Sequence, residues 1–224
     1  MTGDILNSSM LIFKKDLKSE LRTRYVINSL LMFVLVTISA IRFALGDEKT
    51  ENEILTGLLW ISIFFSTSNG LSRTFVKEEE RETSIALKLS SDSTAVLTGK
   101  LLFNLVLSFA LNILILILFI LITDYSVKNV SGFLITVIIG NFGLVSASTI
   151  IAAIISKANS KGTLYPVLSF PVLLPLLITV INATKLASLG VGTEKLYGEI
   201  IILVSYTIVI TVVSYMLFRF VWED

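Results

Sequence analysis

The sequence predicts an all-α integral membrane protein with six transmembrane helices. Of its 224 residues, 54% are hydrophobic, and the mean hydropathy of +0.86 is higher than soluble domains of this length usually reach. An apolar run of about 17–25 residues can cross a bilayer as a helix. Six such runs occur, at residues 25–45, 54–72, 101–123, 130–155, 164–181 and 200–221. We expect them to form one transmembrane domain that covers residues 1–224.

Composition excludes several classes of function. The net charge of +1 is too small for a nucleic-acid-binding protein, which carries a strong basic excess. The sequence contains no cysteine and no histidine, so it lacks thiolate ligands, the commonest general base and the usual axial ligand of haem iron. It has no phosphate-binding G-x-x-x-x-G-K-[ST] loop. We therefore expect a non-catalytic chain that binds no metal or cofactor, with any ATP hydrolysis in a separate subunit.

Lysine and arginine predict the orientation of the helices, because cytoplasmic loops carry an excess of both. If the N-terminus is cytoplasmic, 13 of the 18 basic residues fall in cytoplasmic segments and four in outer segments, with Arg42 inside the first run. This asymmetry predicts that both termini, and the polar segment after the second run, lie in the cytoplasm.

Residues 1–24 precede the first run, and from residue 8 onward they have the pattern of an amphipathic helix. Apolar side chains recur at spacings of three and four while basic side chains take the other face. The apolar ones are Met10, Phe13, Leu17 and Leu21, and the basic ones are Lys14, Lys15, Lys18, Arg22 and Arg24. Such a helix can lie in the membrane interface with its lysines toward anionic headgroups. The alternative is a short soluble helix that packs on the protein.

The one long polar stretch, residues 75–104, lies between the second and third runs. It holds nine of the 35 charged residues (18 basic and 17 acidic), a density that cannot lie in hydrocarbon. We expect residues 73–100, called the coupling segment below, to form a cytoplasmic helix that leaves the membrane, turns and returns. Its exposed acidic residues would be Glu78, Glu79, Glu80 and Glu82, and its apolar edge Ile85, Leu87 and Leu89. The alternative is a solvated loop without a partner.

The fourth run is rich in small residues. Gly143 and Ala147, and likewise Ser148 and Ala152, are four positions apart. This small-xxx-small spacing lets another helix approach closely. It predicts a packing face for a helix of this chain or of a second copy.

The fifth run contains all three prolines, Pro166, Pro171 and Pro175. Each lacks a backbone N–H and loosens the helix around it, so they predict either a static kinked helix or a hinge. Residues 182–199, the longest outer segment, follow this run and leave room for a short interfacial piece before the sixth.

The coupling segment also carries a specific pattern. It reads F-V-x-E-E-E-x-x-[TS]-x-x-x-L-x-L-S, then after a short gap G-K-x-x-x-N, at Phe75, Val76, Glu78, Glu79, Glu80, Thr83, Leu87, Leu89, Ser90, Gly99, Lys100 and Asn104. This pattern resembles the one between the second and third spans of ABC-2-type export permeases, and it is most similar to that of the cytochrome c maturation protein B family. The stretch 169–176, S-F-P-V-L-L-P-L, is similar to the start of that family's fifth span. The sequence departs from the family at Ser91, where a proline is usual, and at Glu82, where a glycine is frequent.

The resemblance implies the permease subunit of a haem exporter in the bacterial cytoplasmic (inner) membrane. In such a complex an ATP-binding subunit grips the loop between spans two and three, so the quoted residues from Phe75 to Ser90 would couple this chain to the ATPase. The implied partners are that subunit with its ATP and Mg, a second copy of this chain, a haem-handling membrane protein and a haem chaperone. The implied task is haem export or release of the haem-loaded chaperone. Two alternatives stay open: an ABC-2 permease that exports a drug, lipid or polysaccharide, and a non-transporting membrane scaffold.

Overall fold

The computed structural model describes residues 2–22, 24–46, 50–158 and 161–223. The long helices are α1 (Thr2–Arg22), α2 (Arg24–Leu45), α3 (Asn52–Leu71), α6 (Ser93–Thr123), α7 (Val130–Ser156), α8 (Lys161–Ser188) and α9 (Tyr197–Glu223). Two short helices, α4 (Val76–Glu80) and α5 (Ser84–Ser90), and the 3-10 turn η1 (Thr193–Leu196) complete the described ranges, which contain no strand. Six helices there are long and apolar enough to cross a membrane, which confirms the predicted fold class.

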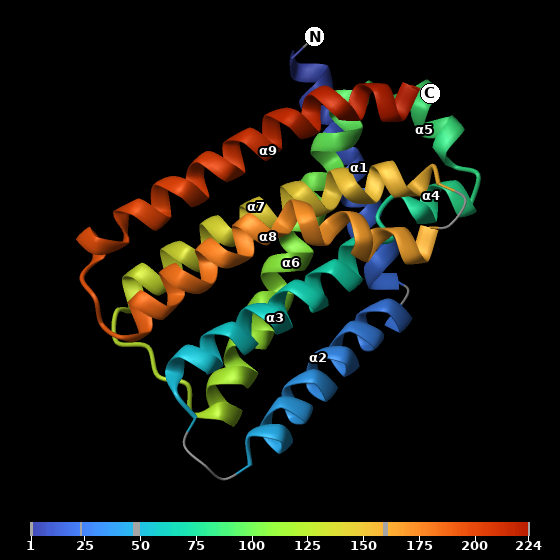
Figure 1. The fold of residues 1–224 in the computed structure, drawn as a ribbon. Helices are drawn as coiled ribbons and strands as arrows, with labels where there is room; N and C mark the ends of the chain where they lie inside the picture. Colours follow the sequence, from blue (N-terminus) through green and yellow to red (C-terminus); the bar gives the residue numbers. More distant parts are fainter. Residues whose placement is uncertain (1, 23, 47–49, 159–160, 224) are drawn as a thin grey trace.

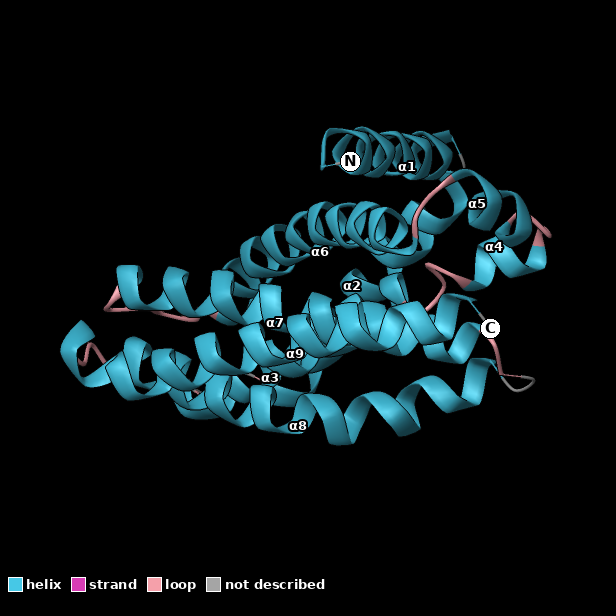
Figure 2. Cartoon of the chain, turned by 90° about the horizontal axis from the view of Figure 1, so that it is seen from above, coloured by secondary structure: helices cyan, strands magenta, loops and turns pink. Residues whose placement is uncertain are grey.

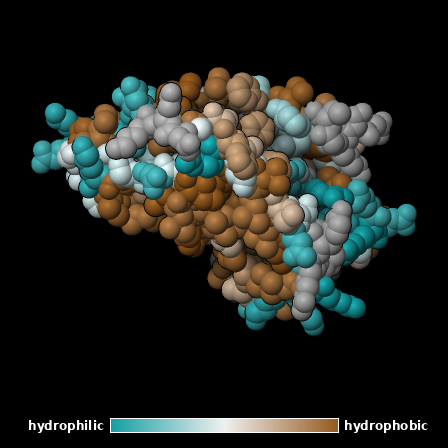
Figure 3. All heavy atoms as spheres, turned by 90° about the horizontal axis from the view of Figure 1, so that it is seen from below, coloured by the Kyte–Doolittle hydropathy of each residue, from teal (hydrophilic) through white to brown (hydrophobic). Residues whose placement is uncertain are grey.

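The spanning helices α2, α3 and α6 to α9 form one bundle (Figure 1). The α2–α3, α6–α7 and α8–α9 connections lie at one end, and both termini lie at the other end with α4 and α5. An apolar surface covers the middle of the molecule between polar ends (Figure 3). The termini and the coupling segment thus share one side, as the predicted topology requires.

The central helix is α7, which packs against α8 and α9 and also contacts α3 and α6. Its glycines make this packing possible. A Cβ at Gly140 would lie 2.7 Å from Val180 of α8, and one at Gly143 would lie 2.9 Å from Thr207 of α9. The other small residues of the predicted packing face are also buried, namely Ala147, Ser148 and Ala152. The close approach at Gly143 therefore involves helices of the same chain.

Helix α1 lies outside the bundle as a layer along α6 (Figure 2). The side it turns to α6 includes Ser9 and Ile12, both buried, whereas Met10 and Leu21 of the predicted apolar face are exposed. Phe13 and Leu17 of that face are half-buried, so the bundle covers the predicted apolar face only in part. Residues 1 and 23 of the predicted helix and the side chain of Arg24 lie outside the described residues.

The spans α6 and α8 exceed the apolar runs that predict them by the most. α6 begins at Ser93, where Asp92 caps the helix by accepting a hydrogen bond from the backbone N–H of Thr94 (2.8 Å). α8 continues to Ser188, so the expected outer segment 182–199 is mostly helical. A turn at Gly190, with φ of +82°, leads from α8 into η1, where Leu196 is fully buried. Hydropathy underestimates these helices because it detects only their membrane-embedded length.

Candidate functional site

The coupling segment folds as two short helices and then joins α6. After α3 the chain turns at residues 72–75 and forms α4, and a second turn leads into α5. At the second turn Glu82 has a φ of +56°, in the left-handed region that favours glycine. Glycine is frequent at this position in the cytochrome c maturation protein B family, which the sequence resembles. This sequence therefore forms the turn with a residue that is less suited to a positive φ. Ser91, by contrast, is extended and donates its N–H to the carbonyl of Leu87 (3.1 Å), which a proline could not do.

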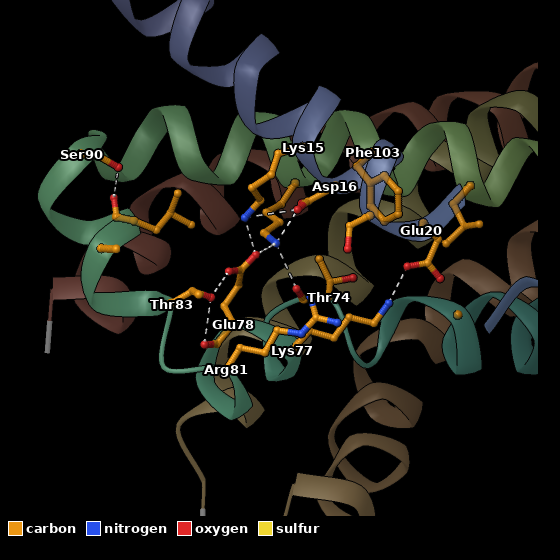
Figure 4. A pocket seen from close by; sticks show the side chains of 16 residues that line it. Lys15, Asp16, Glu20, Thr74, Lys77, Glu78, Arg81, Thr83, Ser90 and Phe103 are labelled. Atoms are coloured by element: carbon orange, nitrogen blue, oxygen red, sulfur yellow. Dashed lines mark hydrogen bonds and ion pairs between the residues drawn. The ribbon is translucent and has the colours of Figure 1, made fainter. Parts of the chain in front are cut away.

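The most unusual group at this end of the bundle is a buried lysine. Lys100 of α6 has a side chain only 3% exposed, and its ammonium lies 2.8 Å from both Glu78 of α4 and Asp16 of α1. It also donates to the backbone carbonyl of Thr74 (3.2 Å), and Lys15 approaches the same Glu78 oxygen to 2.6 Å (Figure 4). We call Lys15, Asp16, Thr74, Glu78 and Lys100 the Lys100 cluster. It joins α1, α4 and α6.

The Lys100 cluster changes the interpretation of the acidic residues. The expectation that Glu78 is exposed is wrong, since this residue is only 7% exposed. A buried ammonium is tolerated only with a compensating charge and hydrogen bonds, and Glu78 supplies both. Its other oxygen accepts a hydrogen bond from the hydroxyl of Thr83 (2.6 Å), which ties the turn between α4 and α5 to the same carboxylate.

The electrostatics of Lys15 follow from the same contacts. Burial opposes its charged form, but the hydrogen bond to Glu78 and the negative charges of Asp16 and Glu78 outweigh burial and raise the pKa of Lys15 above its usual value of 10.5. Lys15 therefore stays charged and keeps α1 attached to α4 at neutral pH.

Further ion pairs and aromatic contacts fix α4. Lys77 pairs with Glu20 of α1 (2.5 Å), and Glu79 pairs with Lys157 at the end of α7 (3.0 Å). Phe75, just before α4, is 1% exposed. Its ring centroid lies 5.4 Å from that of Phe218 and 6.0 Å from that of Trp222, both in α9. Helix α4 is thus connected to α1, α6, α7 and α9.

Helix α5 has the opposite character. Ile85 is 65% exposed and Leu89 is 85% exposed, although both are apolar. Glu80, Glu82, Thr83 and Ser90 are exposed near them, and Leu87 is half-buried. The residues predicted to couple to a partner therefore fall into a buried group, Phe75, Val76 and Glu78, and an exposed group around α5.

The G-K-x-x-x-N part of the pattern, Gly99, Lys100 and Asn104, has a structural role at each of its three named residues. A Cβ on Gly99 would lie 2.8 Å from both Ile12 Cβ and the Ser9 carbonyl, so only glycine lets α1 approach α6 this closely. Lys100 holds the cluster described above. Asn104 accepts a hydrogen bond from Thr74 (3.0 Å) and donates one to Thr149 of α7 (2.8 Å). A lysine at the start of an apolar run was the signal for a buried charge.

The three prolines all lie within α8, which continues through Pro166, Pro171 and Pro175. Between the last two, the hydroxyl of Tyr206 donates to the carbonyl of Val172 (2.9 Å), which connects α8 to α9. This proline-containing half of α8 lies at the end of the bundle that carries the coupling segment.

Comparison with known proteins gives one family. The model of the family described as CcmB protein matches residues 7–220, nearly the whole chain. Among curated proteins no match is found.

Proposed function

The chain belongs to the CcmB family, whose members are multi-pass membrane components of a haem-exporting ABC system, and we propose that it transmits the work of ATP hydrolysis into the membrane. Two copies pair with two ATP-binding subunits in the bacterial inner membrane, with both termini and α4–α5 in the cytoplasm. ATP turnover then releases the haem-loaded chaperone on the outer side. The observation that carries this proposal is the contrast between an exposed α5 and an α4 anchored by the buried Lys100 cluster.

Helix α5 is the docking element of this proposal. An apolar edge at Ile85 and Leu89, with Glu80 and Glu82 nearby, suits a partner groove that is apolar at its centre and basic at its rim. Isolated exposed apolar side chains are common on protein surfaces, but here two lie on one short helix at the polar end of the bundle. Contact with the ATP-binding subunit would cover them.

Helix α4 is the transmitting element. Displacement of α5 acts on α4. Helix α4 contacts α6 through the ion pair of Glu78 with Lys100, and the adjacent Phe75 contacts α9 through its aromatic ring. Charged and aromatic contacts of this kind are rigid enough to move helices as bodies. The prolines of α8 would let the inner half of that helix bend while α7 stays fixed in the core. In this scheme the chain itself ligates no haem iron, in keeping with its lack of histidine and cysteine, two of the usual axial ligands.

The docking proposal is tested with Ile85→Asp and Leu89→Asp in the complex purified from its native membrane. Both variants should insert normally but lose most of the co-purifying ATP-binding subunit, because a carboxylate at the centre of an apolar contact is left desolvated. Leu189→Asp is the matched control, as it changes an exposed leucine that lies after α8, at the opposite end. Full retention of the ATPase by both α5 variants would contradict docking at this edge.

The family membership favours haem over the drugs, lipids and polysaccharides exported by other ABC-2 permeases. The finer task is tested by reconstituting the complex with the haem-loaded chaperone in vesicles. ATP should increase the release of the chaperone from the outer face, and a non-hydrolysed analogue should not. A scaffold would hold the same partners but give equal release with and without ATP.

A further inference from the structure

An apolar groove runs between α1, α2 and α6 on the inner half of the bundle. It has a volume of about 460 Å³ and is lined by apolar residues, Leu17, Leu21, Ile27, Leu30, Phe103 and Leu114 among them. Along α6 it extends from Phe103 to Leu114, which is about 17 Å at the helical rise of about 1.5 Å per residue. This length matches roughly one leaflet of a hydrocarbon core about 30 Å thick, so the groove suits an acyl chain.

A polar cleft adjoins the groove at its coupling-segment end. The cleft has a volume of about 430 Å³ and includes Lys77 and Arg81 among its lining residues. Glu20, Phe103 and Leu107 line both the cleft and the groove, so the two lie next to each other. A polar cleft next to an apolar groove of leaflet depth has the form of a site for one amphiphile.

At the junction, Glu20 has an unsatisfied hydrogen-bond acceptor. This residue is 6% exposed, and its Oε2 pairs with Lys77 (2.5 Å; Figure 4). Its Oε1 is buried and has no hydrogen-bond partner among the described residues. Buried carboxylate oxygens are normally paired with a donor. Because Glu20 lines both cavities, a small rotation of its side chain would bring Oε1 to a donor on a ligand bound there.

We propose that this is a binding site for a zwitterionic aminophospholipid, of which phosphatidylethanolamine is the type. One acyl chain lies in the groove, and the phosphate lies against Arg81 and Lys77. The primary ammonium donates a hydrogen bond to Oε1 of Glu20. This inference does not depend on the proposed function, because it concerns only the contact of α1, α2 and α6 with the bilayer.

The charges of the cleft favour a zwitterion over an anionic lipid. The cleft is lined by four basic side chains, Lys15, Lys77, Arg81 and Lys100, and three acidic ones, Asp16, Glu20 and Glu78. Lys15 and Lys100 already pair with Glu78, and Lys100 also with Asp16. A headgroup at Lys77 and Arg81 therefore has the carboxylate of Glu20 beside it, which would repel a headgroup that carries only negative charge. An anionic lipid would also leave Oε1 of Glu20 without a donor. The ammonium of an aminophospholipid removes both disadvantages.

The headgroup is tested by native mass spectrometry of the full chain with its co-purifying subunits, titrated with dioleoyl phosphatidylethanolamine or dioleoyl phosphatidylglycerol. The ethanolamine lipid should bind about tenfold more tightly, the effect of one charge-assisted hydrogen bond. Glu20→Gln should reduce this preference to about twofold or less, whereas Glu199→Gln, at the start of α9, should leave it unchanged. Equal binding of the two lipids by the unaltered chain, or tighter binding of the glycerol lipid, would overturn the proposal.

The acyl chain is tested with two phenylalanine substitutions on α6. Ala110→Phe fills the groove and should weaken binding of the ethanolamine lipid about tenfold, while Ile113→Phe, at an exposed α6 residue not among the groove's lining, should not. Both variants keep an apolar residue at a surface position, so both should insert and fold. Unchanged lipid binding by Ala110→Phe would overturn the assignment of the groove. Occupation of the groove by a helix of a partner protein, seen by cross-linking at residue 110, would also overturn it.

Discussion

Replacement of Lys100 by methionine is the most direct perturbation of the anchored helix α4. Methionine has similar length but no charge, so Lys100→Met removes the cation that lies 2.8 Å from both Glu78 and Asp16. The side chains of these two acids are only 10% and 11% exposed. Removal of one partner from a buried ion pair costs about 3–5 kcal/mol. Lys15, at 2.6 Å from Glu78, retains part of the compensation, so we expect a loss of about 2–4 kcal/mol.

The loss should be local to the coupling segment and measurable by hydrogen exchange. A reduction of about 2–4 kcal/mol in the free energy of local opening accelerates exchange roughly 30- to 1,000-fold. The affected amides should be those of residues 76–90, with no comparable change in α7. Lys195→Met, which removes an exposed lysine at the opposite end, is the control.

A second substitution distinguishes charge from packing. A buried ion pair replaced on both sides by apolar residues is often neutral for stability. Lys100→Met combined with Glu78→Met should therefore recover at least half of the lost protection. Two results would refute the anchoring role. One is an exchange rate in Lys100→Met within twofold of that in the unaltered chain. The other is exchange in the double variant that is as fast as in Lys100→Met alone.

Three further predictions concern the same end of the bundle. Gly99→Ala should cost about 1–3 kcal/mol by overpacking against Ile12, seen as faster exchange in α1; an unchanged rate would show that α1 does not depend on the close approach. Glu82→Gly should slow exchange in α4 and α5 severalfold, because glycine accepts the φ of +56° without strain; Glu82→Val should do the reverse. The raised pKa of Lys15 means that its pairing with Glu78 stabilises the fold below pH 10.5 and is lost as the pH rises through the higher folded-state pKa. A spin-label distance between α1 and α4 should accordingly lengthen only above about pH 10.5, and lengthening between pH 7 and 9 would contradict this assignment.

The spanning helices were predictable because apolar length is a local property of the sequence. The runs at 25–45 and 130–155 agree closely with α2 and α7. Helix ends outside the hydrocarbon were less predictable, as α6 shows, since its first turns are polar and depend on a cap at Asp92. Hydropathy does not register such turns.

The candidate site was predictable in its location but not in its contacts. The charges of the coupling segment indicated a water-facing element, and α5 fits that description. Glu78 pairs with Lys100, 22 positions away, and with Lys15, 63 positions away. No spacing rule relates residues so distant in sequence. The face of α1 that contacts α6 was not predictable for a similar reason. Ile12 packs against α6 where Gly99 lets the two helices approach closely, and the apolar periodicity of α1 alone does not indicate this contact.

The central claim is that an ATP-driven movement of the coupling segment reaches the spanning helices. The chain has no cysteine of its own, so cysteines introduced by Phe65→Cys in α3 and Phe170→Cys in α8 would be its only sites for a thiol-reactive spin label. Both phenylalanines are exposed, by 53% and 54%. We predict that ATP shifts the distance between these labels in the complete complex, and that Lys100→Met abolishes the shift while the ATPase stays bound. A distance that does not respond to ATP in the unaltered complex would contradict the claim.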